Sequence, residues 1–174
     1  DAITTGDYNV GVGDNALTSV TTGNYNTANG YKALFYNTTA SNNTATGYQS
    51  MYWNTTGAYN SALGEGSLQS NTSGNHNTAV GYRALYESTT ANSNTAVGKG
   101  SLSANTTGAE NTGLGRSSLE KNTTGASNVA VGAYAMLDNT TGFNSTALGR
   151  EALANNTTGS NNTTLGYAAG DNIT

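Results

Sequence analysis

A glycine recurs every 17 residues along this chain without a slip in register. These anchor glycines are Gly13, Gly30, Gly47, Gly64, Gly81, Gly98, Gly115, Gly132, Gly149 and Gly166. Each repeat approximates Asn-Thr-Ala-Val-Gly, two variable residues, Ala or Ser, Leu, two variable residues, Asn-Thr-Thr-Gly and two more variable residues. Strict repetition at this length is typical of a solenoid, in which each repeat forms one coil and stacks on its neighbours. We therefore predict a single solenoid domain of ten coils over residues 1–174.

The composition indicates that the coils are built from β-strands. The chain contains no proline, a residue that cannot donate a backbone hydrogen bond to a neighbouring strand. The density of Gly, Thr and Asn and the lack of an apolar stripe with helical spacing argue against helix throughout. The sequence therefore predicts an all-β protein with the architecture of a parallel β-solenoid.

Comparison of the copies assigns roles to the apolar columns. A leucine column follows the first nine anchor glycines by four residues and consists of Leu17, Leu34, Met51, Leu68, Leu85, Leu102, Leu119, Met136 and Leu153. We expect this column to form the core, with Met replacing Leu at similar volume. The residue two before the glycine is usually Ala, and the residue directly before it is usually Val or Leu. Since successive strand residues face opposite sides, these two columns point to opposite faces.

An outward aliphatic stripe has a consequence for assembly. The leucine column alone supplies little apolar burial against the entropy of ordering the whole chain. Side-by-side packing of chains on the outward stripe would supply more. We therefore expect self-association, as a homotrimer or a filament.

Two glycine columns and one asparagine column indicate turns. The anchor glycine never varies, which predicts a positive φ or a contact too close for a Cβ. The second glycine, in Thr-Thr-Gly, is replaced by Ala40 and Ala91, so this position requires a small residue more than a left-handed backbone. The asparagine of Asn-Thr-Thr-Gly lapses only to Val20 and Ser88 among the complete repeats. We expect stacked Asn and Thr side chains to form hydrogen-bonded ladders along the axis.

Charge and composition exclude several partners. The net charge is −4 and the six Lys and Arg are scattered, so no track for phosphates forms and no nucleic-acid partner is expected. No apolar run approaches the roughly 20 residues of a membrane span. The chain lacks cysteine, which excludes disulfides and thiolate metal sites.

The residue pattern indicates no enzyme. The carboxylates occupy variable columns and no coil holds an evident pair. His76, the one histidine, lies in a variable turn column without a nucleophile pattern. The glycine-rich loops lack the Lys of a phosphate cradle, and the recurring Asp of calcium-binding solenoids is missing. We therefore expect no catalytic residue, no cofactor and no metal.

Both ends of the sequence fall inside a repeat. Neither end carries the atypical polar repeat that normally caps a solenoid. We expect both ends to continue into, or dock on, further protein, as in a longer fibre.

Aromatic residues cluster in three columns of the N-terminal half. They are Tyr31, Tyr48 and Tyr82, then Phe35, Tyr52 and Tyr86, then Tyr36 and Trp53. Adjacent coils lie about 4.8 Å apart, so these rings should form a patch. Such rings can stack on sugars, and exposed apolar patches often mark interfaces. The eight residues are therefore candidate contacts for a glycan or a partner; the simpler interpretation is that they pack on each other or on a neighbouring chain.

Threonine columns raise two further alternatives. Flat Thr ranks on a solenoid can organise ice, but most Thr here occur in consecutive pairs such as Thr55-Thr56, which point to opposite faces if that segment is a strand. Sequons such as Asn54-Thr55-Thr56 would accept N-glycans in a secretory route. Turn and ladder hydrogen bonds account for the same residues.

The repeat resembles two groups of surface proteins. Asn-Ser/Thr-x-Ala-Val/Ile-Gly resembles the head repeats of trimeric autotransporter adhesins. The longer pattern, as in Asn60–Gly74, Asn77–Leu85 and Asn94–Gly108, resembles repeats of tail-fibre-like surface proteins of bacteria and phages. The resemblance implies a left-handed parallel β-roll, a trimer and an extracellular location, as an appendage on the surface of a cell or virion. The sequence thus predicts a non-enzymatic structural or adhesive segment of an extracellular fibre, with glycan binding and ice binding as alternatives.

Overall fold

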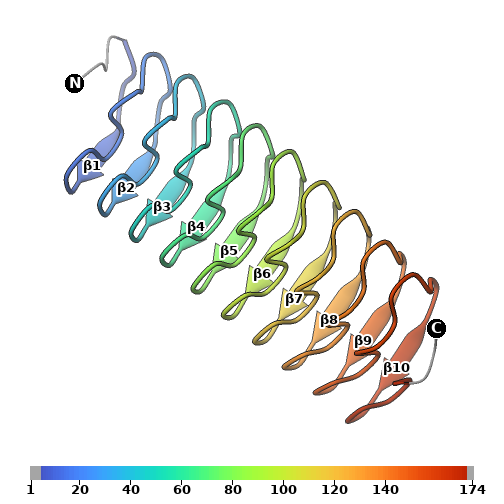
Figure 1. The fold of residues 1–174 in the computed structure, drawn as a ribbon. Coiled ribbons are helices and arrows are strands. Elements are labelled where there is room, and N and C mark those ends of the chain that lie inside the picture. Colours follow the sequence, from blue (N-terminus) through green and yellow to red (C-terminus); the bar gives the residue numbers. More distant parts are fainter. Residues whose placement is uncertain (1–4, 172–174) are drawn as a thin grey trace.

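The computed structural model describes residues 5–171, which form a β-solenoid with one short strand per coil and no helix (Figure 1). The strands are β1 (Val10–Val12), β2 (Thr27–Asn29), β3 (Thr44–Thr46), β4 (Ser61–Leu63), β5 (Thr78–Val80), β6 (Thr95–Val97), β7 (Thr112–Leu114), β8 (Val129–Val131), β9 (Thr146–Leu148) and β10 (Thr163–Leu165). They pair in parallel, in sequence order, and form one sheet of ten strands. The predicted parallel β-solenoid is confirmed.

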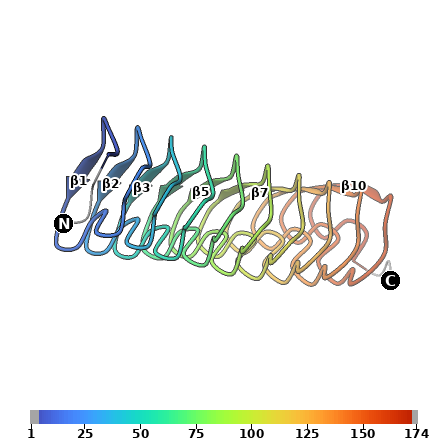
Figure 2. The ribbon, with the colours of Figure 1, turned by 90° about the horizontal axis from the view of Figure 1, so that it is seen from above.

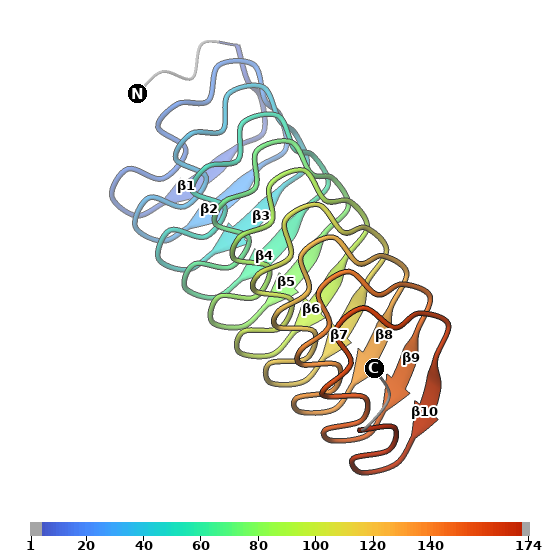
Figure 3. The same ribbon diagram turned by 45° about the vertical axis from the view of Figure 1, so that its right-hand side comes forward.

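The coils stack in register to form an elongated rod. Thr78 of β5 pairs with Thr95 of β6, one repeat later, and the same offset holds along the whole sheet. Figures 2 and 3 show that the ten strands share one side of the rod and that irregular segments close each coil on the other sides. We number the coils by their strands.

Backbone hydrogen bonds run along the axis in the irregular segments as well as in the strands. The N–H of Gly81 donates to the carbonyl of Leu63 in the preceding coil at 2.7 Å. The N–H of Leu85 donates to Ser101 in the following coil at 3.0 Å. Each coil is therefore bonded on both sides, which meets the need of buried backbone groups for partners.

The middle residues of β2 to β10 and the leucine column fill the interior. In coil 5, Ala79 and Leu85 are fully buried, whereas Thr78 and Val80 point outward from the strand. Leu17 is 3% exposed and the eight later members of the leucine column are 0% exposed. The predicted core column and the predicted opposition of the Ala and Val columns are both confirmed.

The anchor glycines are required for two reasons at once. Their φ angles lie between 118° and 143°, where residues with a Cβ are strained. A Cβ on Gly81 would also lie 2.7 Å from the carbonyl oxygen of Gly98 in the next coil. Both predicted causes of the invariant glycine are confirmed.

Left-handed backbone at non-glycine residues is the main feature that the sequence did not indicate. Coil 5 has Arg83, Leu85 and Ser93 at φ 53°, 52° and 59°, and other coils repeat these positions. No Val, Ile or Thr occupies any of the left-handed positions in the described residues. β-Branched side chains are the least compatible with this region. The leucine column therefore contains unbranched-Cβ residues, Leu or Met.

Two asparagine ladders hold the ends of each coil together. One asparagine precedes the strand and the other begins Asn-Thr-Thr-Gly; we call them the strand asparagine and the turn asparagine. In coil 3, Asn43 and Asn54 are buried, and each donates to the carbonyl oxygen of Gly57 at 2.9 Å. Asn54 also donates to the side-chain oxygen of Asn37 in the preceding coil at 2.9 Å. The predicted ladders are confirmed.

The glycine carbonyl that accepts hydrogen bonds from both asparagines explains why the second glycine column contains only small residues. A Cβ on Gly108 would collide with the carbonyl oxygen of Gly125 and with the side-chain oxygen of Asn105. Its φ is outside the left-handed region. The requirement is therefore for size, as predicted, and Ala40 and Ala91 occur in the same column.

Candidate functional surfaces

Because side chains fill the interior, the candidate surfaces lie on the outside of the rod. The sheet face carries mostly Thr in its first rank, with Val10, Ser61 and Val129 as the exceptions, and mostly Val or Leu in its second rank, two residues further along each strand. Leu63 is 52% exposed and Val97 is 38% exposed. The predicted aliphatic stripe is therefore present, and Asn29 and Thr46 interrupt it in coils 2 and 3, as the sequence indicates.

The consecutive threonines lie in a bend on another side of the coil and not in a strand. The hydroxyl of Thr55 donates to the carbonyl of Thr72 in the next coil at 2.9 Å. Thr56 is exposed, and its side chain makes no hydrogen bond with the described residues. The pair therefore provides one bonded and one exposed rank, not a flat double rank.

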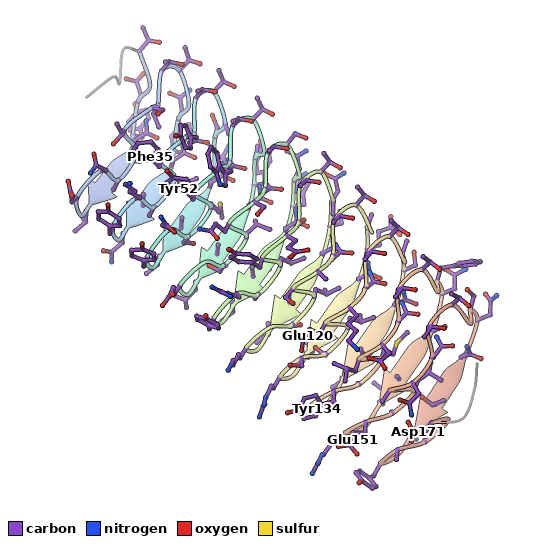
Figure 4. All side chains as sticks on the ribbon, in the orientation of Figure 1. Phe35, Tyr52, Glu120, Tyr134, Glu151 and Asp171 are labelled. Carbon is purple, nitrogen blue, oxygen red and sulfur yellow. The ribbon has the colours of Figure 1, made fainter. Side chains whose placement is uncertain are left out.

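The aromatic patch forms on coils 2 and 3 and contains six of the eight predicted residues. Tyr31 stacks on Tyr48 with ring centroids 5.3 Å apart. In the adjoining columns Phe35 stacks on Tyr52 at 5.4 Å, and Tyr36 stacks on Trp53 at 4.5 Å. Figure 4 shows Phe35 and Tyr52 side by side near the start of the rod.

The patch also perturbs two titratable groups. The Nζ atom of Lys32 lies 5.2 Å from the Tyr31 ring centroid and 5.6 Å from that of Phe35. A hydrogen bond to the Tyr31 hydroxyl raises the pKa of Lys32 above its ordinary value. Burial, followed by a hydrogen bond to Tyr36, raises the pKa of the Tyr52 phenol. Both groups keep their ordinary charge at neutral pH.

Tyr82 and Tyr86, the remaining two predicted residues, lie apart from this patch. Coil 4 separates them from it, because Glu65 and Gln69 occupy the corresponding columns there. Between the two rings lies Arg83, whose Cζ is 5.1 Å from the Tyr82 centroid and 4.9 Å from the Tyr86 centroid. The second cluster is thus aromatic and cationic.

Two hollows flank this cluster. The larger, of about 290 Å³, lies over Gly100 and is bordered by Tyr82, Arg83, Tyr86, Glu87, Lys99 and Glu120. The smaller, of about 90 Å³, lies over Gly66 and shares Arg83 and Tyr86 with the first. We call them the Gly100 hollow and the Gly66 hollow. Figure 4 shows Glu120 projecting outward further along the rod.

The sequence contained a signal for these hollows that we did not interpret. Gly66 and Gly100 occupy the column two residues after the anchor glycine, where other coils carry larger residues such as Lys32, Gln49 and Tyr134. These residues have left-handed φ angles, as the two glycines do. At Gly100 an added Cβ would approach nothing closer than 3.7 Å. Contacts with neighbouring atoms therefore do not require a glycine at this position.

A third hollow of about 340 Å³ lies on coils 8 to 10, beside Tyr134, Glu151 and Asp171, which Figure 4 places near the end of the rod. Arg150 and Glu151 form an ion pair there at 2.8 Å. Glu151, a carboxylate that borders this hollow, is therefore already paired with an arginine.

Within residues 5–171, the other polar candidates do not come together in one site. His76 is exposed and stacks on Tyr59 at 5.1 Å between centroids. Among residues 5–171 no group of three or more His, Cys, Asp and Glu side chains could hold a metal ion. The turn asparagines of the sequons, such as Asn54, are buried in the ladder. An N-glycan on them is incompatible with the folded coil.

Comparisons with known proteins leave the family open. No family model matches the chain, and no curated protein or solved structure matches it. Within residues 5–171 the chain has no helix with the length and apolar character needed to cross a membrane.

Proposed function

We propose that this chain is a non-enzymatic structural segment of an extracellular fibre, and that copies associate through the sheet face. The observation that carries the proposal is the unbroken register of ten coils, which gives a rod with an aliphatic stripe that is continuous from Leu63 to Leu165. Repetition of one coil sets the length of such a rod, and each coil contacts only its neighbours. The extracellular location and the trimer come from the resemblance of the repeat and stay predictions.

The physical reason for association is the exposed second rank of the sheet face. Burying apolar surface is favourable in proportion to its area, at about 25 cal/mol per Å². The stripe repeats at every coil from Leu63 in coil 4 to Leu165 in coil 10, so two rods can align along this part of their length. Lysine in this rank would place charge in the interface, which is costly without a partner.

Solution mass by light scattering, followed by electron microscopy of the same sample, tests the proposal. We expect trimers or filaments of the native chain. The double variant Val97→Lys and Leu114→Lys should be monomeric. The matched control, Thr107→Lys and Thr124→Lys in the same coils but in the bend, should assemble as the native chain does. A native chain that stays monomeric at high concentration contradicts self-association.

Ice binding is a second candidate that one observation favours. The sheet face, unlike the threonine pairs, places Thr and an aliphatic residue at i and i+2, so both point outward. The ranks repeat about every 4.8 Å along the axis on a flat sheet. Thermal hysteresis of the native chain, abolished by Thr95→Lys and Thr112→Lys, would support this candidate. Absence of hysteresis rejects it and leaves the sheet face for self-association.

A further inference from the structure

We propose that the flank of the rod over the Gly66 and Gly100 hollows binds an extended, neutral polysaccharide whose chain runs parallel to the rod axis. This inference goes beyond the role of a structural rod and does not depend on it. It also places the glycan at coils 3 to 7, where Tyr48, which lines the Gly66 hollow, is the residue shared with the six-ring patch of coils 2 and 3.

The two hollows are built from the same local feature. At their column the backbone turns outward in the left-handed region, so a long side chain there stands on the surface. Glycine at Gly66 and Gly100 removes that side chain and opens the space. Over Gly66, the Tyr86 ring and the Arg83 side chain lie 3.4 and 3.5 Å from where a Cβ would be. The wall between the two hollows is therefore made by Arg83 and Tyr86.

The wall offers the contacts that pyranose rings require. Sugars present apolar C–H faces and polar edges, so they pack on aromatic rings while their hydroxyls bond to nearby polar groups. Tyr82 and Tyr86 supply rings with polar tips. A ligand site of this kind combines aromatic surface with a small number of placed polar groups.

The charges favour a neutral ligand. Arg83 and Lys99 border the Gly100 hollow together with Glu87 and Glu120, so the two signs balance. Within the described residues, the carboxylates of Glu87 and Glu120 form no ion pair and accept no hydrogen bond. Ionised carboxylates accept strong hydrogen bonds from hydroxyls. Glu87 and Glu120 would repel an anionic polymer. The hydroxyls of a neutral polyol can hydrogen-bond to both the cationic and the anionic side chains.

The spacing of the hollows favours a polymer over a single sugar. Gly66 and Gly100 are two repeats apart, which corresponds to about 10 Å along the axis. This is the length of a disaccharide unit in an extended, β-linked polysaccharide. Such a chain presents equivalent sugar faces at every second residue, so it can occupy both hollows while passing Tyr86. Two linked contacts bind more tightly than either contact alone.

Isothermal titration calorimetry with cellohexaose, xylohexaose and chitohexaose tests the proposal, with the disaccharide of each as a comparison. We expect at least one hexasaccharide to bind and to bind about tenfold or more tightly than its disaccharide. Failure of all three hexasaccharides to bind at about 1 mM would overturn the proposal. Equal affinity of the disaccharide would also overturn it, because the second hollow would then contribute nothing.

Variants locate the site. Gly100→Tyr should fill the larger hollow and weaken hexasaccharide binding about tenfold or more. The fold already accepts Tyr134 in this column at φ 62°. The matched control is Asn15→Tyr, which adds the same side chain in the same column of coil 1, away from the hollows. Equal weakening by both variants, or by neither, contradicts the assignment.

A second pair of variants keeps the test independent of the filled hollow. Tyr86→Ala removes the shared wall and should weaken binding about tenfold. Tyr25→Ala removes an exposed ring that stacks only on Tyr8, and should leave binding unchanged. These measurements use the native assembly in whatever state light scattering finds, so their failure leaves the fibre proposal intact, and the reverse also holds.

Discussion

At the leucine column, backbone conformation and core packing act on the same residue. Leu85 is fully buried and has φ 52°. Placing a residue that has a Cβ in the left-handed region costs roughly 1–2 kcal/mol. The conformation persists along the leucine column because it directs these side chains into the core. The column therefore selects side chains by branching as well as by volume.

Leu85→Ile should be strongly destabilising although the volume is unchanged. Branching at Cβ adds strain in the left-handed region, so we expect a loss of about 2–4 kcal/mol in the free energy of unfolding. Leu85→Met, with precedent at Met51 and Met136, should cost under about 1.5 kcal/mol. Urea denaturation measures both. Equal losses would mean that the left-handed backbone does not select the residue.

Gly81→Ala should disrupt the stack of coils. The new Cβ would press on the carbonyl of Gly98 in a backbone region that disfavours it, which we expect to cost about 2–5 kcal/mol. Gly100→Ala is the control, because its Cβ has open space, and should cost about 1 kcal/mol. Thermal melting monitored by circular dichroism compares the two. A mild Gly81→Ala variant would be evidence against close coil contact.

Ser88→Asn should repair the one gap inside the turn-asparagine ladder. The Oδ1 atom of Asn71 and the Oγ atom of Ser88 are buried without a hydrogen-bond partner. A new amide at this position would donate to Asn71 and to the carbonyl of Ala91, as its counterparts do in other coils. We expect a gain of about 1 kcal/mol in unfolding free energy. Ser88→Ala separates this gain from mere removal of the unpaired hydroxyl, and an equal gain there would refute the ladder explanation.

At the scale of the element, the unit is the coil and not the strand. Each strand has only three residues, and each is held by axial bonds shared with the bends that follow it. Deleting residues 94–144, three whole repeats, should leave a folded rod that is about 14 Å shorter by X-ray scattering. A deletion one residue shorter shifts the register and places every later column on the wrong face. We expect that second variant to lose structure beyond the join.

The sequence could predict the repeat, the parallel stacking and the role of most columns, because ten copies reveal which positions tolerate change. It could not predict the left-handed leucine, since Leu is uncommon in that conformation and only the assembled coil overrides the local preference. It also could not locate the hollows. To locate them one must know that the column of Gly66 and Gly100 points outward. One must also know that the Arg83 side chain extends toward Gly66 in the preceding coil.

At the scale of the whole molecule, the two proposed roles use unlike flanks of one rod. The sheet face offers an apolar stripe that is continuous over coils 4 to 10, whereas the Tyr82–Glu120 flank varies from coil to coil. A regular flank suits contacts with identical rods. A variable flank suits recognition at one place along the length. Self-association and glycan binding can therefore occur together, since they use separate surfaces.

The asparagine ladders also give the rod a direction. The backbone N–H of Asn60 donates to the side-chain oxygen of Asn43 at 2.9 Å, which fixes that amide with its oxygen toward the later coil. The turn asparagines point the same way, as Asn122 donates to Asn105 of the coil before it at 2.8 Å. The amide dipoles consequently add, much as peptide dipoles do in a helix. The ladder amides at a cut end of this solenoid therefore present donors on one side and acceptors on the other, so the ladders can continue across a head-to-tail junction but not across a head-to-head one.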